Sequence, residues 1–371
     1  MKLRLSGPAI AALVALQLSY AQTPAPKVIP NEPTCPQCTI GVQNLVTLGT
    51  EDGIGSLNGK PMSVNVDSRG RYWIFEELEP PTVFAATGGV IQTVGRKGRG
   101  PGEFQAANNG IVVGDSMLVF DWMEMRATMI GPDLKAGRTI RTGHGVSDVL
   151  VLAWPTMLVT ASHRQGSNPP NSSMHRFSLA GPEMQVLGSF GPRGTGGSMG
   201  NVDVQQLIGR ASDGIWSAYW NRPQFMRWDR NGIVRLTLTR RFDWFTPEMK
   251  SSLGTPKTPP QPRTAAIHED TDGLVWLFIH TPAPTWREGW EAPPTRFPGA
   301  GTEYAMKTMG WDKLFRTYVE VINPVQARVV SSTTVNGYVF ETLPDRRVAL
   351  YKVDENGIPR VQIAQLSLNG R

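Results

Sequence analysis

The chain has 371 residues, of which 40% are hydrophobic and 8% aromatic, and its formal net charge is +6. Its 39 Gly, 30 Pro and 11 Trp favour one domain of short strands joined by many turns, with little helix. The positive excess is mild and comes without a Lys/Arg-rich run or a nucleic-acid-binding motif, so nucleic acid is excluded as an expected partner.

The first residues have the pattern of a secretory signal peptide. Lys2 and Arg4 precede an apolar run from Ala9 to Leu18, and Ser19-Tyr20-Ala21 is a small-x-small cleavage site. Removal of residues 1–21 lowers the charge to about +4 and predicts a secreted or periplasmic protein. The apolar run is about half as long as a membrane helix, so no membrane span is expected.

Residues 22–42 are predicted to form an extended tether, and residues 22–34, which contain four prolines, are expected to be disordered. The tether contains Cys35-Pro36-Gln37-Cys38, and in an exported chain such a pair favours a local disulfide. Two alternatives remain open. A redox motif would need a βαβ setting, and a zinc site would need two further ligands.

A weak repeat of apolar strand pairs occupies residues 43–371, with the spacing of about 45–50 residues that is typical of propeller blades. The clearest copy places strand-like runs at Ser63–Val66 and Tyr72–Phe75 on either side of an Asp-x-x-Gly turn. Related turns occur at Asp213-Gly214, Asp272-Gly273 and Asn336-Gly337.

The number of blades follows from hairpins in which two apolar runs flank a turn that contains Gly or Pro. These hairpins are Val83–Val94, Ala127–Ile140, Arg176–Leu187, Phe225–Leu236, Tyr318–Val330 and Leu350–Ile363. We therefore predict an all-β, six-bladed β-propeller with antiparallel four-stranded blades, with five or seven blades as alternatives.

Two further expectations concern how complete the blades are. The inner strands near Gly110–Phe120 and Asp148–Thr160 have the weakest pattern. The run Leu45–Leu48 has no partner in its own segment, so we expect this N-terminal strand to complete the last blade and close the ring.

The string Gly-Arg-Gly-Pro-Gly-Glu-Phe at residues 98–104 resembles the inter-blade segment of NHL-type and TolB-like six-bladed propellers, and Val64–Ile74 is similar to the strand pair of that family. The resemblance covers the architecture of residues 43–368 and implies no catalytic residues. A phosphate-binding loop at Gly95–Gly102 is the alternative, but a strand follows this segment where a phosphate loop would lead into a helix.

An insertion at about residues 281–315 of the fifth blade carries aromatic side chains, which indicates that it packs on the protein as a filler or as a ligand lid. In a four-stranded blade, the loop between strands two and three lies on the same face as the connections between blades. We expect Arg240 on this face together with a set of ligand-binding candidates. The candidates are Arg96, Arg99, His163, Arg222, Arg241, Trp286, Arg287 and Trp290.

The predicted function is an exported, non-catalytic module that binds a protein, a glycan or an anionic small ligand through this cationic and aromatic face, without a cofactor. The alternative is a metal-assisted hydrolase or lyase with a divalent cation at the propeller axis. A mixed metal site of His268, Glu269, Asp270 and His280 is a separate hypothesis, beside the simpler interpretation of these residues as a polar turn.

Overall fold

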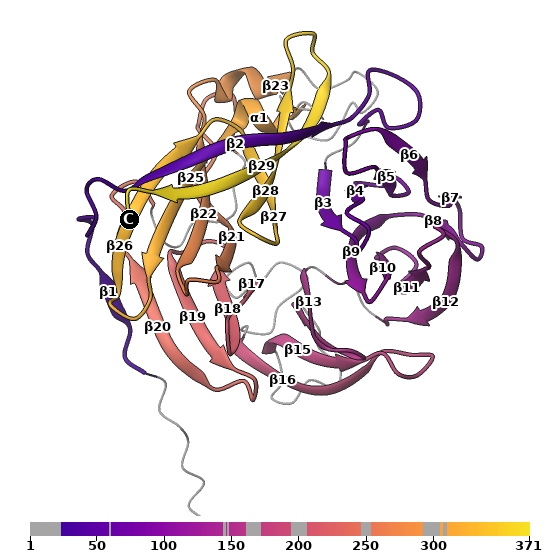
Figure 1. Cartoon of the computed structure of the whole chain (residues 1–371), viewed down its shortest axis with the longest axis horizontal. Helices are drawn as coiled ribbons and strands as arrows, with labels where there is room; N and C mark the ends of the chain where they lie inside the picture. Colours follow the sequence, from indigo (N-terminus) through magenta and orange to yellow (C-terminus); the bar gives the residue numbers. More distant parts are fainter. Residues whose placement is uncertain are drawn as a thin grey trace, which may run out of the picture.

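The computed structural model describes residues 24–58, 61–143, 146, 148–160, 172–193, 206–245, 254–291, 305–306 and 310–371. The protein is a six-bladed β-propeller, in which six antiparallel four-stranded sheets surround a central axis (Figure 1). The predicted signal peptide, His163 and the middle of the 281–315 insertion lie outside the described residues.

The strands of each blade are ordered from the axis to the rim. The innermost strands are β3 (Pro61–Val66), β9 (Ala107–Val113), β13 (Asp148–Ala153), β17 (Gln206–Arg210), β21 (Arg263–Glu269) and β27 (Tyr338–Leu343). The second strands are β4 (Tyr72–Glu76), β10 (Ser116–Asp121), β14 (Thr156–Thr160), β18 (Gly214–Tyr219), β22 (Val275–Pro282) and β28 (Arg347–Val353). The third strands are β5 (Thr82–Phe84), β11 (Arg126–Ile130), β15 (Ser172–Ser178), β19 (Gln224–Asp229), β25 (Phe315–Asn323) and β29 (Pro359–Asn369). The outermost strands are β6 (Val90–Thr93), β12 (Ala136–Arg141), β16 (Gln185–Arg193), β20 (Val234–Arg240), β26 (Arg328–Val335) and β2 (Thr39–Leu48).

Short elements connect or supplement the blades. They are β1 (Lys27–Ile29), β7 (Arg96–Lys97), β8 (Glu103–Phe104), β23 (Trp290–Glu291), β24 (Ala305–Met306), the 3-10 helix η2 (Trp286–Gly289) and the helix α1 (Trp311–Leu314). The inner strands of blades two and three, which had the weakest sequence pattern, form antiparallel pairs, each interrupted by one register shift.

The Asp-x-x-Gly turn of the repeat is held together by its aspartate. The Asp67 carboxylate accepts hydrogen bonds from the backbone N–H groups of Arg69 and Arg71, both at 3.0 Å, and from the indole N–H of Trp73 at 2.9 Å. Because its N–H is satisfied within the turn, the Trp73 ring is buried against blade two without an unpaired polar atom. The turn thus fixes both the hairpin and the contact with the next blade.

The same arrangement recurs in blade five. There Asp270 accepts hydrogen bonds from the backbone N–H groups of Asp272 and Leu274 and from the indole of Trp276. The Trp276 ring packs between blades five and six, beside Val348. The core is therefore a series of clusters, each shared by two neighbouring blades, so no blade buries its apolar face alone.

The ring is closed by the N-terminal strand, as the sequence predicts. β2 pairs with β29 in an antiparallel ladder from Thr39 and Asn369 to Leu48 and Val361 (Figure 1). The strand is longer than the expected Leu45–Leu48, and it forms the rim of the last blade. The side chain of Leu48 is fully buried beside Leu57 and Val361.

The segment that precedes the disulfide is ordered, so the expectation of a disordered tether is wrong for Lys27–Ile29. This strand, β1, pairs in parallel with β20 on the rim of blade four. The Arg240 guanidinium fixes it by donating hydrogen bonds to the Ile29 carbonyl at 3.0 Å and to Asn31 Oδ1 at 2.8 Å. Ile29 and Arg240 lie more than 200 positions apart in the chain, so a local sequence pattern does not predict their pairing.

Arg240 is also misplaced by the sequence prediction, because it is only 3% exposed and does not lie on the ligand face. It forms a bidentate ion pair with Glu320 of blade five, with N···O distances of 2.7 and 2.8 Å. The pair joins blades four and five, and the guanidinium links both of them to the N-terminal segment.

The predicted disulfide between Cys35 and Cys38 is present. The Cys38 side chain is buried between blades five and six, in the same cluster as Val330 and Leu366. The disulfide therefore anchors the start of β2 at the interface that this strand closes.

Ring closure makes one position of β2 critical. We expect Leu48→Ala to lower the free energy of unfolding by about 2–5 kcal/mol, because the change leaves a cavity at the junction of the first and last blades. Leu45→Ala is the control on the same strand, since Leu45 is 47% exposed, and it should change stability by less than about 0.5 kcal/mol. Urea denaturation measures both values. Equal losses would show that β2 does not close a packed interface.

The Arg240–Glu320 pair gives a second expectation. Arg240→Met should cost about 3–5 kcal/mol, because it leaves the buried Glu320 carboxylate without its cationic partner, with only the Tyr318 hydroxyl still donating to it. Adding Glu320→Gln should recover part of this loss, whereas the neighbouring exposed change Arg241→Met should be nearly neutral. Limited proteolysis should also cut residues 27–31 faster in Arg240→Met. Unchanged cleavage there would contradict the role of Arg240 as an anchor for β1.

Candidate functional site

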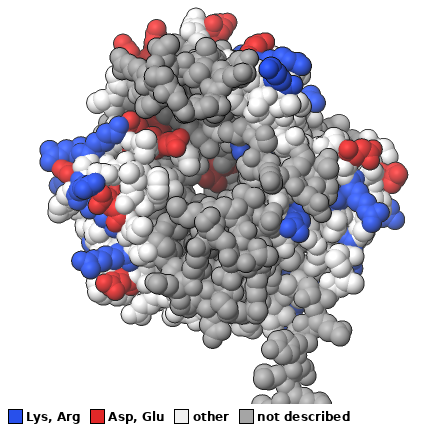
Figure 2. Space-filling view, turned by 180° about the vertical axis from the view of Figure 1, so that it is seen from behind, with Lys and Arg blue, Asp and Glu red and all other residues white. Residues whose placement is uncertain are grey.

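The first candidate is the predicted ligand face, and the structure neutralises several of its cations. Arg96 forms an ion pair with Glu103 at 2.6 Å, and Arg99 forms one with Glu124 at 3.2 Å. The described charges of both signs are interspersed along the rim in Figure 2. The segment from Gly95 to Phe104 is an inter-blade turn, as predicted, with the Phe104 ring fully buried.

The remaining candidates of this face have different environments. The Arg222 guanidinium lies 4.3 Å from the centre of the Tyr219 ring, and that of Arg287 lies 4.3 Å from the centre of the Trp286 ring. Trp286 is buried and Trp290 half-buried, while Arg241 is exposed. The role of these side chains in ligand binding stays a prediction.

The described ends of the blade-five insertion pack on the last blade. Trp311 and Leu314 of α1 are buried in a cluster with Phe315, Tyr338 and Tyr351. The Tyr351 ring is fully buried, so this part of the insertion completes a core. The filler interpretation therefore holds for the described ends.

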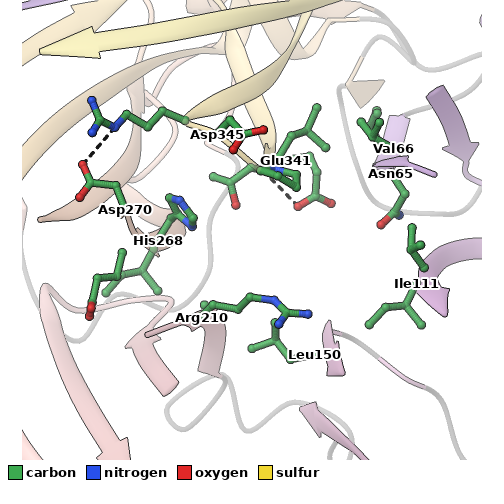
Figure 3. A pocket seen from close by; sticks show the side chains of 18 of the residues that line it. Asn65, Val66, Ile111, Leu150, Arg210, His268, Asp270, Glu341 and Asp345 are labelled. Carbon is green, nitrogen blue, oxygen red and sulfur yellow. Dashed lines mark hydrogen bonds and ion pairs between the residues drawn. The ribbon is translucent and has the colours of Figure 1, made fainter. Parts of the chain in front are cut away.

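The second candidate is a cavity of about 970 Å³ on the propeller axis. Every innermost strand contributes to its wall, and each contributes a polar side chain. These polar residues are Asn65, Asn109, Asp148, Arg210, His268 and Glu341, in the order of the blades. Figure 3 shows Asn65, Arg210, His268 and Glu341 arranged around the cavity, and acidic atoms are visible in the central hollow of Figure 2. A cavity of this size lies at the upper end of the range of small-molecule sites.

Asp148 and Glu341, two of the acidic residues that line the cavity, are held by the backbones of neighbouring blades. Asp148 Oδ2 accepts a hydrogen bond from the Ile208 N–H at 3.0 Å, and its Oδ1 accepts one from the Val149 N–H at 2.8 Å. Glu341 accepts hydrogen bonds from the N–H groups of Thr342 and Val64. Each carboxylate thus bridges two blades and stays fixed in position at the wall.

Both carboxyl groups titrate far above their ordinary range. Burial raises the pKa of Asp148 to about 6, against the hydrogen bonds from Ile208 and Val149. Burial, and then the charge of Asp148, raise the pKa of Glu341 to about 8. At pH 7 Glu341 therefore mostly keeps its proton, while Asp148 is mostly ionised. Shifted pairs of this kind are common at functional sites.

Two basic side chains of the innermost strands also line the cavity, beside Arg346, which forms an ion pair with Asp270. Burial lowers the pKa of His268, against the charges of Asp270 and Glu269, so the imidazole is neutral at pH 7. Arg210 is exposed to the cavity, and within the described part of the chain its guanidinium forms no ion pair and no hydrogen bond. Figure 3 shows this side chain extending into the cavity. An unpaired guanidinium at the wall is free to bind an anionic group.

The mixed metal site does not form. The Glu269 carboxylate accepts hydrogen bonds from the Trp216 indole and the Ser212 N–H, and His280 Nε2 contacts the Val339 carbonyl. Asp270 closes its own turn. Among the residues that the structure describes, no three His, Cys, Asp or Glu side chains are grouped to hold a metal ion.

Sequence reasoning missed Asp148, Arg210 and Glu341. Each of them belongs to an innermost strand whose apolar pattern is short or interrupted. The sequence does show one charged residue in each of these short apolar strands. Because the strands are otherwise packed between blades, such a charged side chain reaches water only at the axis.

This chain resembles known proteins in its fold and not in its sequence. No family model matches the sequence, and no curated protein matches it. A crystal structure of a DUF4221 family member from Bacteroides vulgatus is similar with a TM-score of 0.57 and 12% identity, over 90% of this chain and 99% of that one. A putative exported protein from Bacteroides fragilis is similar with a TM-score of 0.55 and 10% identity, over 92% of this chain and 99% of that one. These likenesses confirm the six-bladed architecture.

The raised pKa values make stability depend on pH. A carboxyl group whose pKa is higher in the folded than in the unfolded protein contributes most below the unfolded value near 4, and this contribution is lost as the pH rises through 6 for Asp148 and 8 for Glu341. In Glu341→Gln the new side chain has nearly the shape of the protonated Glu341 carboxyl group but cannot ionise. We expect it to raise the melting temperature at pH 8.5 by about 2–4 °C and to change it little at pH 5.

The exposed change Glu355→Gln is the control, and it should leave the pH profile unchanged. Differential scanning calorimetry between pH 5 and 8.5 measures the effect. If the unmodified protein and Glu341→Gln lost stability in parallel between pH 5 and 8.5, the raised pKa of Glu341 would not be the cause of the pH dependence.

Proposed function

We propose that this protein is an exported, non-catalytic binding module that holds a small polar ligand in the cavity on its axis. The carrying observation is that all six innermost strands direct a polar side chain to one cavity, with the Arg210 guanidinium left unpaired within the described residues. The propeller fold fits such a module. Charged groups that are partly buried in the wall of a cavity cost free energy unless a ligand or water complements them.

Export is part of this proposal. It is supported by the signal-like N-terminus, the Cys35–Cys38 disulfide and the similarity in fold to a putative exported protein. Within the described residues, no helix has the length and apolar character needed to cross a membrane.

A second candidate is binding of a protein, a glycan or an anionic ligand on the cationic and aromatic face. The supporting observation is the exposed Arg287 stacked on Trp286, together with the exposed Arg241, which has no ion-pair partner among the described residues. Stacked guanidinium and indole groups are frequent anchors of interfaces. The two candidates differ in which arginine a ligand needs.

A matched set of arginine variants separates them. Arg210→Met removes the cation of the cavity, Arg241→Met removes one from the face, and Arg328→Met removes an exposed one from the rim of blade five. The compounds to be tested are amino acids, short peptides, organic acids and sugars that raise the melting temperature of the mature protein. Of the three variants, we expect only Arg210→Met to weaken their binding, by at least about tenfold. Calorimetric titration measures the affinities. Loss with Arg241→Met and not with Arg210→Met would refute the cavity and favour the face.

A further inference from the structure

The charges of the axial cavity are separated. Arg210 projects from blade four, while the carboxyl groups of Asp148 and Glu341 project from blades three and six. No ion pair joins Arg210 to either of these carboxyl groups in the described structure. Figure 3 likewise shows Arg210 and Glu341 directed into the cavity from different strands, with no interaction drawn between them. Beside the paired charges of Arg346 and Asp270, the cavity therefore has a cationic region at Arg210 and an acidic region at Asp148 and Glu341.

Each region has free capacity for a ligand. The guanidinium presents up to five N–H donors in a planar fork, which matches a carboxylate in bidentate geometry. Each oxygen of Asp148 accepts one backbone N–H, so a further lone pair remains on both. An ammonium group has three donors, and it is the cation whose hydrogen bonds suit two adjacent carboxyl groups.

The rest of the wall is mixed, with charged residues such as Asp270 and Arg346 beside several aliphatic ones. It includes the side chains of Ile111, Leu150, Ile208, Ile267 and Leu343. A ligand that fills about 970 Å³ must therefore bring apolar surface as well as its charges. A short peptide with apolar side chains and free ends combines these properties.

We infer that the axial cavity binds a short zwitterionic peptide with apolar side chains, with its carboxylate on Arg210 and its ammonium group at Asp148 and Glu341. This inference rests on the proposed function and names the class of ligand for that site. It assigns separate roles to the two charged regions, which can be tested one at a time.

Binding of the ammonium group should be coupled to release of a proton from Glu341. Glu341 shares the cavity with charged or titratable groups from several elements, namely Asp67 after β3, Asp148 of β13, Arg210 of β17, His268 and Glu269 of β21, Asp270 after β21, and Asp345 and Arg346 after β27. A cation beside Glu341 favours its ionised form, so binding should release the proton that it holds at pH 7. Affinity should therefore rise from pH 6 to pH 7, by at most about tenfold for each proton released.

Three matched probes test the two regions. L-leucyl-L-leucine carries both charges, its C-terminal amide lacks the anion, and its N-acetyl form lacks the cation. In calorimetric titrations of the mature protein at pH 7, we expect the free dipeptide to bind at least about tenfold more tightly than either derivative. Titrations in two buffers with different ionisation enthalpies should show proton release with the dipeptide and none with the N-acetyl form.

Two variants assign the preferences to residues. Arg210→Met should abolish the preference for the dipeptide over its amide, and Glu341→Gln should abolish the proton release and reduce the preference over the N-acetyl form. Arg328→Met, on the rim of blade five, should behave as the unmodified protein.

The outcomes separate the inference from the proposed function. If the N-acetyl form bound as tightly as the dipeptide and still needed Arg210, the cavity would be an anion site, and the zwitterion would be refuted while the proposed function stood. If none of the three bound, although another small molecule bound in an Arg210-dependent way, the peptide class would be wrong. If no compound bound in an Arg210-dependent way, both would fail.

Discussion

Closure of the ring by β2 is the constraint on which the rest of the structure depends. Each core cluster is shared by two blades, so the first and last blades would each expose an apolar face if β2 did not hold them together. The Leu48 side chain and the disulfide-linked Cys38 lie at the two ends of this strand, and both are buried. The axial cavity is a consequence of closure, because its wall exists only while six innermost strands converge.

A second constraint acts across the interface of blades four and five. The Arg240–Glu320 pair is bidentate and almost fully buried, and the guanidinium also binds the N-terminal segment through Ile29 and Asn31. A buried pair of this kind adds little net stability compared with apolar packing, but its geometry is specific. It therefore fixes where β1 lies on the rim of blade four.

The sequence predicted the elements that are encoded locally. The turn with Asp67 was recognised because one carboxylate organises residues that follow within six positions, and the hairpins follow from alternating apolar residues and glycines. The pairing of β1 with β20 and the burial of Arg240 could not be predicted, because their partners are distant in the chain. For the site, β-strand alternation does not say which face of a short innermost strand meets the axis, so the roles of Asp148, Arg210 and Glu341 emerged only from the assembled ring.

We propose that this propeller holds its ligand in the axial cavity and not on the cationic face. A crystal structure of the mature protein, grown with the tightest-binding compound from a small-molecule screen, distinguishes the two sites. We expect electron density for the compound within the ring of innermost strands, with an anionic group in contact with the Arg210 guanidinium. Density beside Trp286 and Arg287 with the axial cavity holding only solvent would contradict it.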